Sequence, residues 1–291
     1  MIVAPGVYKI PAEEYHQDPC TQAALSNSII KKLLFHSPRK AWYEHPKLNP
    51  NFKAKEAKET FDVGSVSHDL LLEGLGVCTI VDAEDWRSKA AQETRKIARL
   101  ESKIPLLKHQ YERATAMKKA AEEQIYGCKE LNVSNLKTDG DAELSYIWQE
   151  DGIWLKARLD WIKKDRSLIL DYKTTGTSAN PFDLPRHIIS LGYDIQDPFY
   201  KRAVKTVDKV DARFVFIFQE TEEPYDCSFI ELPELLTDMG KQKVENGIFL
   251  WRECMTSGNW FGYPNKVVKV EAPRWAINDW QYRSEQIGIE E

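Results

Sequence analysis

The chain has 291 residues, 29% of them charged and 11% aromatic, and a formal net charge of −5. This composition excludes disordered and fibrous proteins, and the length allows one large domain or two small ones. The acidic balance excludes binding of nucleic acid by bulk positive charge alone, although a local basic groove stays compatible with it. The sequence has no apolar run of about 18 residues and no signal-peptide pattern, so we expect a cytoplasmic protein without a membrane span.

The five cysteines are far apart and include no Cys-x-x-Cys pair. Their odd number and wide spacing argue against a zinc ribbon and against a disulfide scaffold. We expect reduced thiols that mostly pack within the fold.

The N-terminal part of the chain is predicted to be mostly helical. Residues 24–45 should form two helices divided at Ser37-Pro38, and residues 62–74 a third. A charged, alanine-rich region at about 84–127 is predicted to be a helical insertion. Pro105 would divide it into two solvated helices that pack as an antiparallel pair.

From residue 143 the pattern changes to short alternating segments bounded by turn residues. Strand 143–149 is followed by a hairpin turn at Glu150-Asp151-Gly152. The fold class is therefore α/β of the α+β type, with a central mixed sheet that contains an antiparallel meander and is flanked by helices. The further predicted elements are strands 153–162 and 167–173, a helical segment within 184–207, strands 211–219 and 226–232, a helix over 233–256 and an irregular or short-stranded tail from Gly258.

Two carboxylates and a lysine lie on the predicted meander. Because strand side chains alternate, Asp171 and Lys173 share a face. Asp160 should lie roughly opposite Leu170 and Asp171, and a one-residue shift of the turn near Asp165 decides whether it shares the face of Asp171 and Lys173. Isolated Asp residues near strand ends are usually turn formers, but burying Asp171 and Lys173 after the apolar run 168–170 requires a reason. A divalent metal would offset the repulsion between carboxylates and lower the pKa of its water, as in phosphodiester hydrolysis.

Four motifs in this order resemble the PD-(D/E)XK nuclease superfamily, and within it the branch of the RecB nuclease domain, phage lambda exonuclease and RecE-type recombination exonucleases. The resemblance covers nearly the whole chain. It implies a single nuclease domain over residues 1–291 on a restriction-endonuclease-like core whose meander carries the metal site. The motifs are Gly64-Ser65-Val66-Ser67-His68, Arg158-Leu159-Asp160, Asp171-Tyr172-Lys173-Thr174 and Gln196-Asp197-Pro198-Phe199-Tyr200.

The resemblance also implies a cofactor and a role for each motif residue. The cofactor would be Mg²⁺, and Mn²⁺ should substitute for it, because histidine is a less usual ligand for Mg²⁺. An iron–sulfur cluster is not expected, since the cysteines lack the spacing of a ligand quartet. The implied roles are metal ligand for His68, Asp160, Asp171 and the Tyr172 carbonyl, catalytic lysine for Lys173, and support of the site or of the DNA strand for Gln196 and Tyr200.

One motif departs from the helical pattern, because Pro198 lies between Gln196 and Tyr200. In an unbroken helix these two residues share a face. Proline either kinks such a helix or stands in its first turn. A helix that began at Asp197 would leave Gln196 out of line with Tyr200.

DNA contacts should come from basic residues near the site. The basic segment 31–40 is either a solvated helix face or a phosphate-binding surface. Arg158, close to the predicted chemistry, is the better candidate for a phosphate contact. No segment has the character of a base-reading helix, so we expect contacts to DNA backbone and ends without sequence specificity.

The function implied by the resemblance is that of a metal-dependent exonuclease acting on double-stranded DNA ends. It would digest from 5′ to 3′ and leave 3′ overhangs for phage or prophage recombination, with a single-strand annealing protein as a partner. A ring-shaped homo-oligomer is implied in the same way. The alternatives are an endonuclease of the same superfamily and a catalytically inactive DNA-binding module.

Overall fold

The computed structural model describes residues 1–53, 62–74 and 78–287. It contains two compact units, Met1–Trp260 and Phe261–Glu291. The second unit carries α11 (Arg274–Ile287), a helix where the sequence had predicted an irregular or stranded tail. That prediction was wrong because the helix starts directly after the last proline, Pro273, and no glycine or proline interrupts it. Across the described ranges, no helix is long and apolar enough to cross a membrane.

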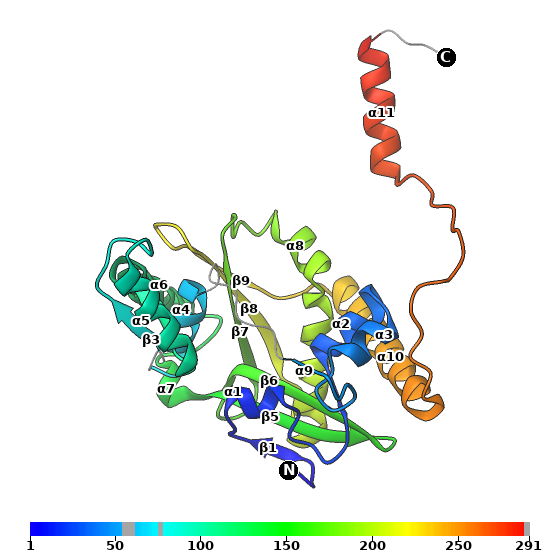
Figure 1. The fold of residues 1–291 in the computed structure, drawn as a ribbon, viewed down its shortest axis with the longest axis horizontal. Helices are drawn as coiled ribbons and strands as arrows, with labels where there is room; N and C mark the ends of the chain where they lie inside the picture. The colour runs from blue at the N-terminus through cyan, green and yellow to red at the C-terminus, as the bar shows by residue number, and fades with distance from the viewer. Residues whose placement is uncertain (54–61, 75–77, 288–291) are drawn as a thin grey trace. The chain divides into compact units, whose positions relative to one another are not determined.

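A seven-stranded mixed sheet forms the centre of the first unit (Figure 1). Its strand order is β1-β5-β6-β7-β8-β9, with β2 also paired to β6. Strands β5, β6 and β7 are the predicted antiparallel meander, and β8 runs parallel to β7 after a helical crossover. The strands are β1 (Gly6–Tyr8), β2 (Ala24–Ser26), β5 (Gly140–Glu150), β6 (Ile153–Lys163), β7 (Leu168–Thr175), β8 (Arg213–Glu220) and β9 (Cys227–Ile230).

The turn between β5 and β6 sets the register of the meander. Asp151 and Gly152 have φ angles of 47° and 80°. Two consecutive positive φ values are typical of the type I′ hairpin turn predicted from the sequence. Glu150 therefore pairs with Ile153, and the ladder continues from there along both strands.

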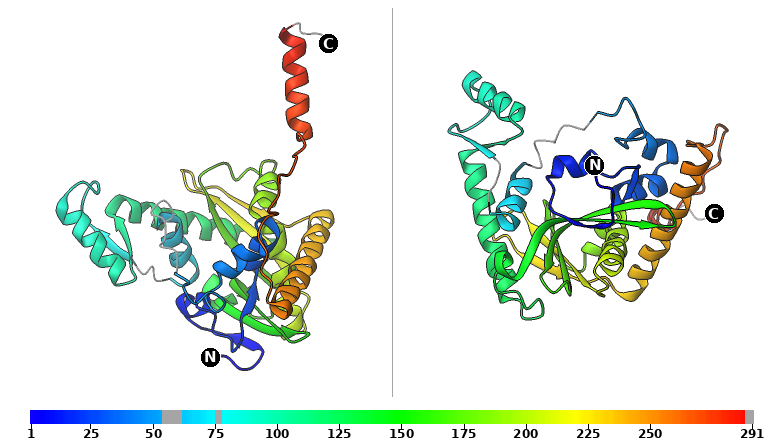
Figure 2. Two further views of the ribbon diagram at one scale, coloured as in Figure 1. Left: turned by 45° about the vertical axis from the view of Figure 1, so that its right-hand side comes forward. Right: turned by 90° about the horizontal axis from the view of Figure 1, so that it is seen from below.

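Helices cover both faces of this sheet (Figures 1 and 2). The larger apolar core packs α2, α9 and α10 on the face that carries Phe214, Phe216 and Phe218. A smaller core packs α4 and α6 on the face that carries Leu170 and Tyr172. The helices described in the first unit, outside the insertion, are α1 (Ala12–His16), α2 (Asn27–Phe35), α3 (Pro38–Tyr43), α4 (Asp62–Leu72), α7 (Leu136–Asp139), α8 (Leu184–Leu191), α9 (Tyr193–Val207) and α10 (Glu234–Ser257).

The region predicted as a helical insertion contains α5 (Lys89–Leu100), β4 (Ile104–Leu107) and α6 (Lys108–Gly127). Pro105 divides the helices as predicted, but it does so from within β4, which pairs in parallel with β3 (Cys78–Val81). Helix α5 packs mainly on this small sheet and α6 mainly on α4, in place of the antiparallel pair predicted from the sequence.

Candidate active site

Asp160 lies on β6 at a point where the neighbouring strands separate. Residues Trp154–Lys156 of β6 pair with β2, whereas Trp161–Ile162 pair with β7. Asp160 therefore lies in a fork between β2 and β7, and its Oδ2 accepts a hydrogen bond from the Tyr172 backbone amide at 2.9 Å. Extending the β6–β7 register by one residue sets Asp160 opposite Asp171, as predicted from the sequence.

Glu143, which the sequence analysis did not single out, lies on β5 across from Asp160. Its backbone has a φ angle of 57°, an unusual left-handed conformation for a residue within a strand. The ladder has no regular pair at this position, although the register on both sides sets the two carboxylates opposite each other, between the pairs Ala142–Trp161 and Leu144–Leu159.

The side chains on either side of Glu143 along β5 pack on opposite faces of the sheet. Ala142 and Trp161 pack in the smaller apolar cluster, whereas Leu144 and Leu159 belong to the larger one. Simple alternation along β5 therefore fails at this residue. The signal that would have identified Glu143 is the hairpin turn, because counting back from Glu150 and Ile153 pairs residue 143 with residue 160.

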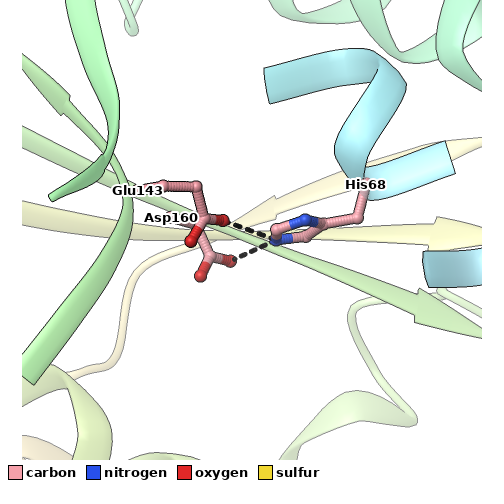
Figure 3. A group of neighbouring side chains, drawn as sticks. All are labelled: His68, Glu143 and Asp160. Carbon is pink, nitrogen blue, oxygen red and sulfur yellow. Dashed lines mark ion pairs between the residues drawn. The ribbon is translucent and has the colours of Figure 1, made fainter. Parts of the chain in front are cut away.

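His68 reaches the two carboxylates from α4 (Figure 3). A Cβ atom at Gly64 would lie 2.5 Å from Thr174 Oγ1, so glycine lets this helix approach β7 closely. His68 Nε2 lies 3.4 Å from Asp160 Oδ2 and 3.6 Å from Glu143 Oε1. The first three motif-bearing segments therefore converge on one point of the sheet.

Asp171 and Lys173 form an ion pair on one face of β7, as their spacing predicted. The Asp171 side chain is fully buried, and the Gln196 side-chain amide of α9 donates a hydrogen bond to its Oδ2. The Lys173 ammonium is also 4.0 Å from Asp160 Oδ2, so it lies between two carboxylates. Apart from Lys173, Asp171 Oδ1 has no partner among the described residues.

These charged groups shift one another's pKa values. Burial alone would lower the pKa of His68, but Asp160 together with Asp69 and Glu143 raises it to about 10. Burial and the neighbouring Asp160 carboxylate raise the pKa of Asp171 to about 7. Although burial opposes it, Asp171 and Asp160 also raise the pKa of Lys173. The raised pKa values of His68 and Lys173 thus favour an imidazolium and an ammonium among the carboxylates, where they offset part of the negative charge.

Comparison with known proteins identifies the family. The model of the PDDEXK-like domain of unknown function (DUF3799) matches residues 26–271 of this chain. The chain belongs to this family. The family match supports the PD-(D/E)XK nuclease superfamily. The mixed sheet with flanking helices is the fold predicted from the sequence.

Solved structures give a further comparison for this PDDEXK-like chain. A candidate exonuclease from Eubacterium rectale is similar to it with a TM-score of 0.56 and 15% identity, over 93% of this chain and 98% of that one. The protein SSO0001 is 14% identical over 74% of this chain and 100% of that one, with a TM-score of 0.27. No curated protein matches the chain.

The donor atoms of the PDDEXK-like site fit a divalent cation. One ligand atom each from His68, Glu143 and Asp160 lie within 4.8 Å of one another, which is compatible with ligands about 2.0–2.6 Å from a shared ion. Two carboxylates with one imidazole suit Mn²⁺ as well as Mg²⁺. The side chains of His68 and Asp160 are 25% and 17% exposed, so both are in contact with solvent. Asp171 lies beside this group, and its role as a ligand, like that of the Tyr172 carbonyl, stays a prediction.

Arg158 contacts the site through Glu143. Its Nε donates to Glu143 Oε2 at 2.5 Å and its Nη1 to the Ile10 carbonyl at 2.7 Å. Arg158 thereby leaves Glu143 Oε1 directed at His68. A phosphate contact from Arg158 stays a prediction and would share the guanidinium with Glu143.

The Gln196 motif lies on one continuous helix, which corrects the helix start at Asp197 considered from the sequence. Helix α9 begins at Tyr193 and passes through Pro198, so Gln196 and Tyr200 are one turn apart. Proline leaves the carbonyl of Asp194 without its helical partner. That carbonyl lies against Gly240 of α10, where a Cβ atom would approach it to 1.9 Å. Glycine at position 240 therefore lets α10 pass close to the turn that contains Pro198, a contact that the sequence of α9 alone could not reveal.

Basic and aromatic residues surround the carboxylates on the α2 side. The ammonium groups of Lys31 and Lys173 lie 5.5 Å and 5.3 Å from the ring centre of Tyr193. A cavity of about 870 Å³ has Arg158 and Tyr200 in its wall, and Arg158 connects it to Glu143, although the candidate metal ligands themselves do not line it. Its lining also includes Lys32, Lys53 and the first residues of α2, which gives the cavity a mixed polar and basic character.

Proposed function

We propose that this chain is a divalent-metal-dependent exodeoxyribonuclease of the RecE or lambda-exonuclease type. It would digest the 5′-ended strand at double-stranded DNA ends and leave a 3′ overhang for recombination. The observation that carries the proposal is the convergence of His68, Glu143 and Asp160 beside the Asp171–Lys173 pair in a PDDEXK-like fold. The cavity beside Arg158 supports a DNA contact next to the site, because Arg158 lines the cavity and also contacts Glu143.

The side chains divide the chemistry between them. A bound Mg²⁺ or Mn²⁺ would supply Lewis acidity and a water of lowered pKa. His68, Glu143 and Asp160 would hold the ion. Lys173 stays protonated at neutral pH, since its carboxylate neighbours raise its pKa, so it acts as a hydrogen-bond donor to charge developing on the phosphoryl oxygens. Gln196 keeps the Asp171 carboxylate directed toward Lys173.

The proposed substrate raises the question of how an acidic chain stays on DNA. With a net charge of −5, long-range attraction to the duplex is weak, and local groups such as Lys31 must provide the phosphate contacts. A ring-shaped homo-oligomer would retain the duplex without bulk attraction, and a single-strand annealing protein would take up the overhang in the cytoplasm. Light scattering of the purified chain with and without duplex ends tests the ring.

The deciding experiment compares a linear duplex labelled at either its 5′ or its 3′ ends with a closed circular duplex, in Mg²⁺, Mn²⁺ or EDTA. We expect early release of the 5′ label, retention of the 3′ label, an intact circle and no reaction in EDTA. Nicking of the circle would identify an endonuclease instead. Binding of the duplex without cleavage in either metal would favour the inactive DNA-binding module.

A further inference from the structure

The side chain of Tyr172 lies on the face of β7 opposite to Asp171 and Lys173. Its hydroxyl is 3.0 Å from Ser67 Oγ and also hydrogen bonds to Gln219 Oε1. All three side chains are buried, with 4% of Tyr172 and 0% of Ser67 and Gln219 exposed. Ser67 immediately precedes His68 on α4, so the hydroxyl of Tyr172 meets the helix that carries the candidate histidine ligand.

Each hydrogen bond in this series is donated in the same direction, from Ser67 through Tyr172 to Gln219. Gln219 Nε2 donates to the carbonyls of Met117 at 2.9 Å and Tyr225 at 3.1 Å. Both amide hydrogens are then used, so the oxygen of Gln219 must face Tyr172 and accept its proton. The oxygen of Tyr172 is left to accept from Ser67. These hydrogen bonds therefore link α4 through β7 and β8 to Met117 of α6, in the inserted region.

Tyr172 touches two of the candidate ligands at the same time. Its backbone amide donates to Asp160 Oδ2 at 2.9 Å, and its ring centre lies 6.0 Å from that of His68. Adjacent residues on a helix point about 100° apart, so fixing the hydroxyl of Ser67 also fixes the rotation of α4 about its axis. That rotation determines whether His68 Nε2 reaches Asp160.

We propose that Tyr172 is a positioning residue that orients His68 and Asp160 for a divalent cation, and that its hydroxyl links this orientation to α6. The inference rests on the metal-dependent site of the proposed function. A phenylalanine ring would fill the smaller core as well as the ring of Tyr172 does. Removing only the hydroxyl group therefore tests positioning of the ligands without changing the packing of the core. Partners that orient metal ligands typically change metal affinity about 10–100-fold when they are removed.

The test measures Mn²⁺ binding by calorimetry, with no need for DNA cleavage. We expect Tyr172→Phe and Ser67→Ala each to raise the Kd for Mn²⁺ about tenfold, and the double variant to be no weaker than the weaker single one, because both remove the same link. The matched control is Tyr146→Phe, which removes a hydroxyl bonded to Asp208 away from the site and should bind like the wild type. Thermal melting establishes that each variant is folded.

A positioning role also predicts how cleavage depends on metal. For Tyr172→Phe, the Mn²⁺ concentration at half-maximal rate should rise about tenfold, while the rate at saturating Mn²⁺ returns close to that of the wild type. Wild-type Mn²⁺ affinity in folded Tyr172→Phe and Ser67→Ala would overturn the inference and leave the proposed function standing. Absence of Mn²⁺ binding by the wild type would overturn both, whereas binding without DNA cleavage would count against the nuclease function alone.

Discussion

The carboxylates of Glu143 and Asp160 face each other across β5 and β6, and His68 Nε2 lies within 3.6 Å of both. Like charges that are directly opposite on neighbouring strands destabilise a sheet. Here the left-handed backbone of Glu143 removes the regular pair, and the imidazolium of His68 offsets the charge. The sheet thus holds two acidic groups in a position that favours a cation, and Glu143 becomes a candidate ligand in its own right.

The first prediction concerns the charge of Glu143. Glu143→Gln keeps the size of the side chain but removes a negative donor, so we expect the Kd for Mn²⁺ to rise by at least about tenfold in calorimetry. Glu150→Gln is the matched control, because Glu150 lies on the same strand and also pairs with an arginine, Arg202. This control should keep wild-type affinity. An equal loss in both variants would point to a general effect on β5 and against a ligand role.

The second prediction separates the catalytic lysine from the metal. Lys173→Met removes the ammonium that faces Asp171, so cleavage should fall by about 10²–10⁴-fold while Mn²⁺ still binds. Asp171→Asn should weaken Mn²⁺ binding as well. Lys201→Met, which removes the partner of the buried Asp197, is the control and should retain cleavage. Wild-type turnover by Lys173→Met would exclude the proposed mechanism.

Much of the meander could be predicted from the sequence, because local chemistry determines it. The turn at Asp151 and Gly152 imposes its type through positive φ angles, and the type sets the register of β5 and β6. Strand alternation then places Asp171 and Lys173 on one face without any tertiary information. Their ion pair follows from that placement.

The remaining parts of the site depend on contacts between distant segments. Strand alternation alone does not predict the position of Glu143, because the alternation of side chains breaks at its left-handed backbone, and only the register counted from the hairpin turn sets it opposite Asp160. Arg158 interacts with Glu143 diagonally across β5 and β6. The motif around Arg158 does not include Glu143, so the sequence analysis predicted only a phosphate contact for this guanidinium. Helix α9 continues through Pro198, and α10 approaches it there at Gly240, more than 40 residues later, so the local sequence of α9 does not show this contact.

The third prediction uses pH to measure the Glu150–Arg202 pair. Burial opposes the shift, but hydrogen bonds from Arg202 and Trp148 lower the pKa of Glu150. A lowered pKa in the folded state stabilises the protein above the unfolded pKa, and this contribution is lost as the pH falls. We expect urea unfolding to show wild type more stable than Glu150→Gln by about 1 kcal/mol at pH 7, with the difference shrinking below about pH 4. A stability difference that does not depend on pH would show that it does not arise from the charge of Glu150.

The fourth prediction tests Gln196. Gln196→Leu removes the donor to Asp171 Oδ2 at similar volume and leaves a buried carboxylate with fewer partners. We expect cleavage to fall by about tenfold or more with a small loss of thermal stability. Gln92→Leu, on the exposed surface of α5, should change neither quantity. Full activity in folded Gln196→Leu would remove this residue from the site.

The last prediction links metal to stability. A cation that binds the folded chain alone stabilises it by about 2.7 kcal/mol at a concentration 100 times its Kd. For a unit of this size that corresponds to a rise in melting temperature of roughly 5–10 °C. We expect thermal melting to show this rise in wild type when Mn²⁺ replaces EDTA, because the ion relieves the repulsion between Glu143 and Asp160. In Asp160→Asn, which removes one of the two charges, the rise should largely disappear. Equal stabilisation of both proteins would mean that Mn²⁺ binds elsewhere on the chain.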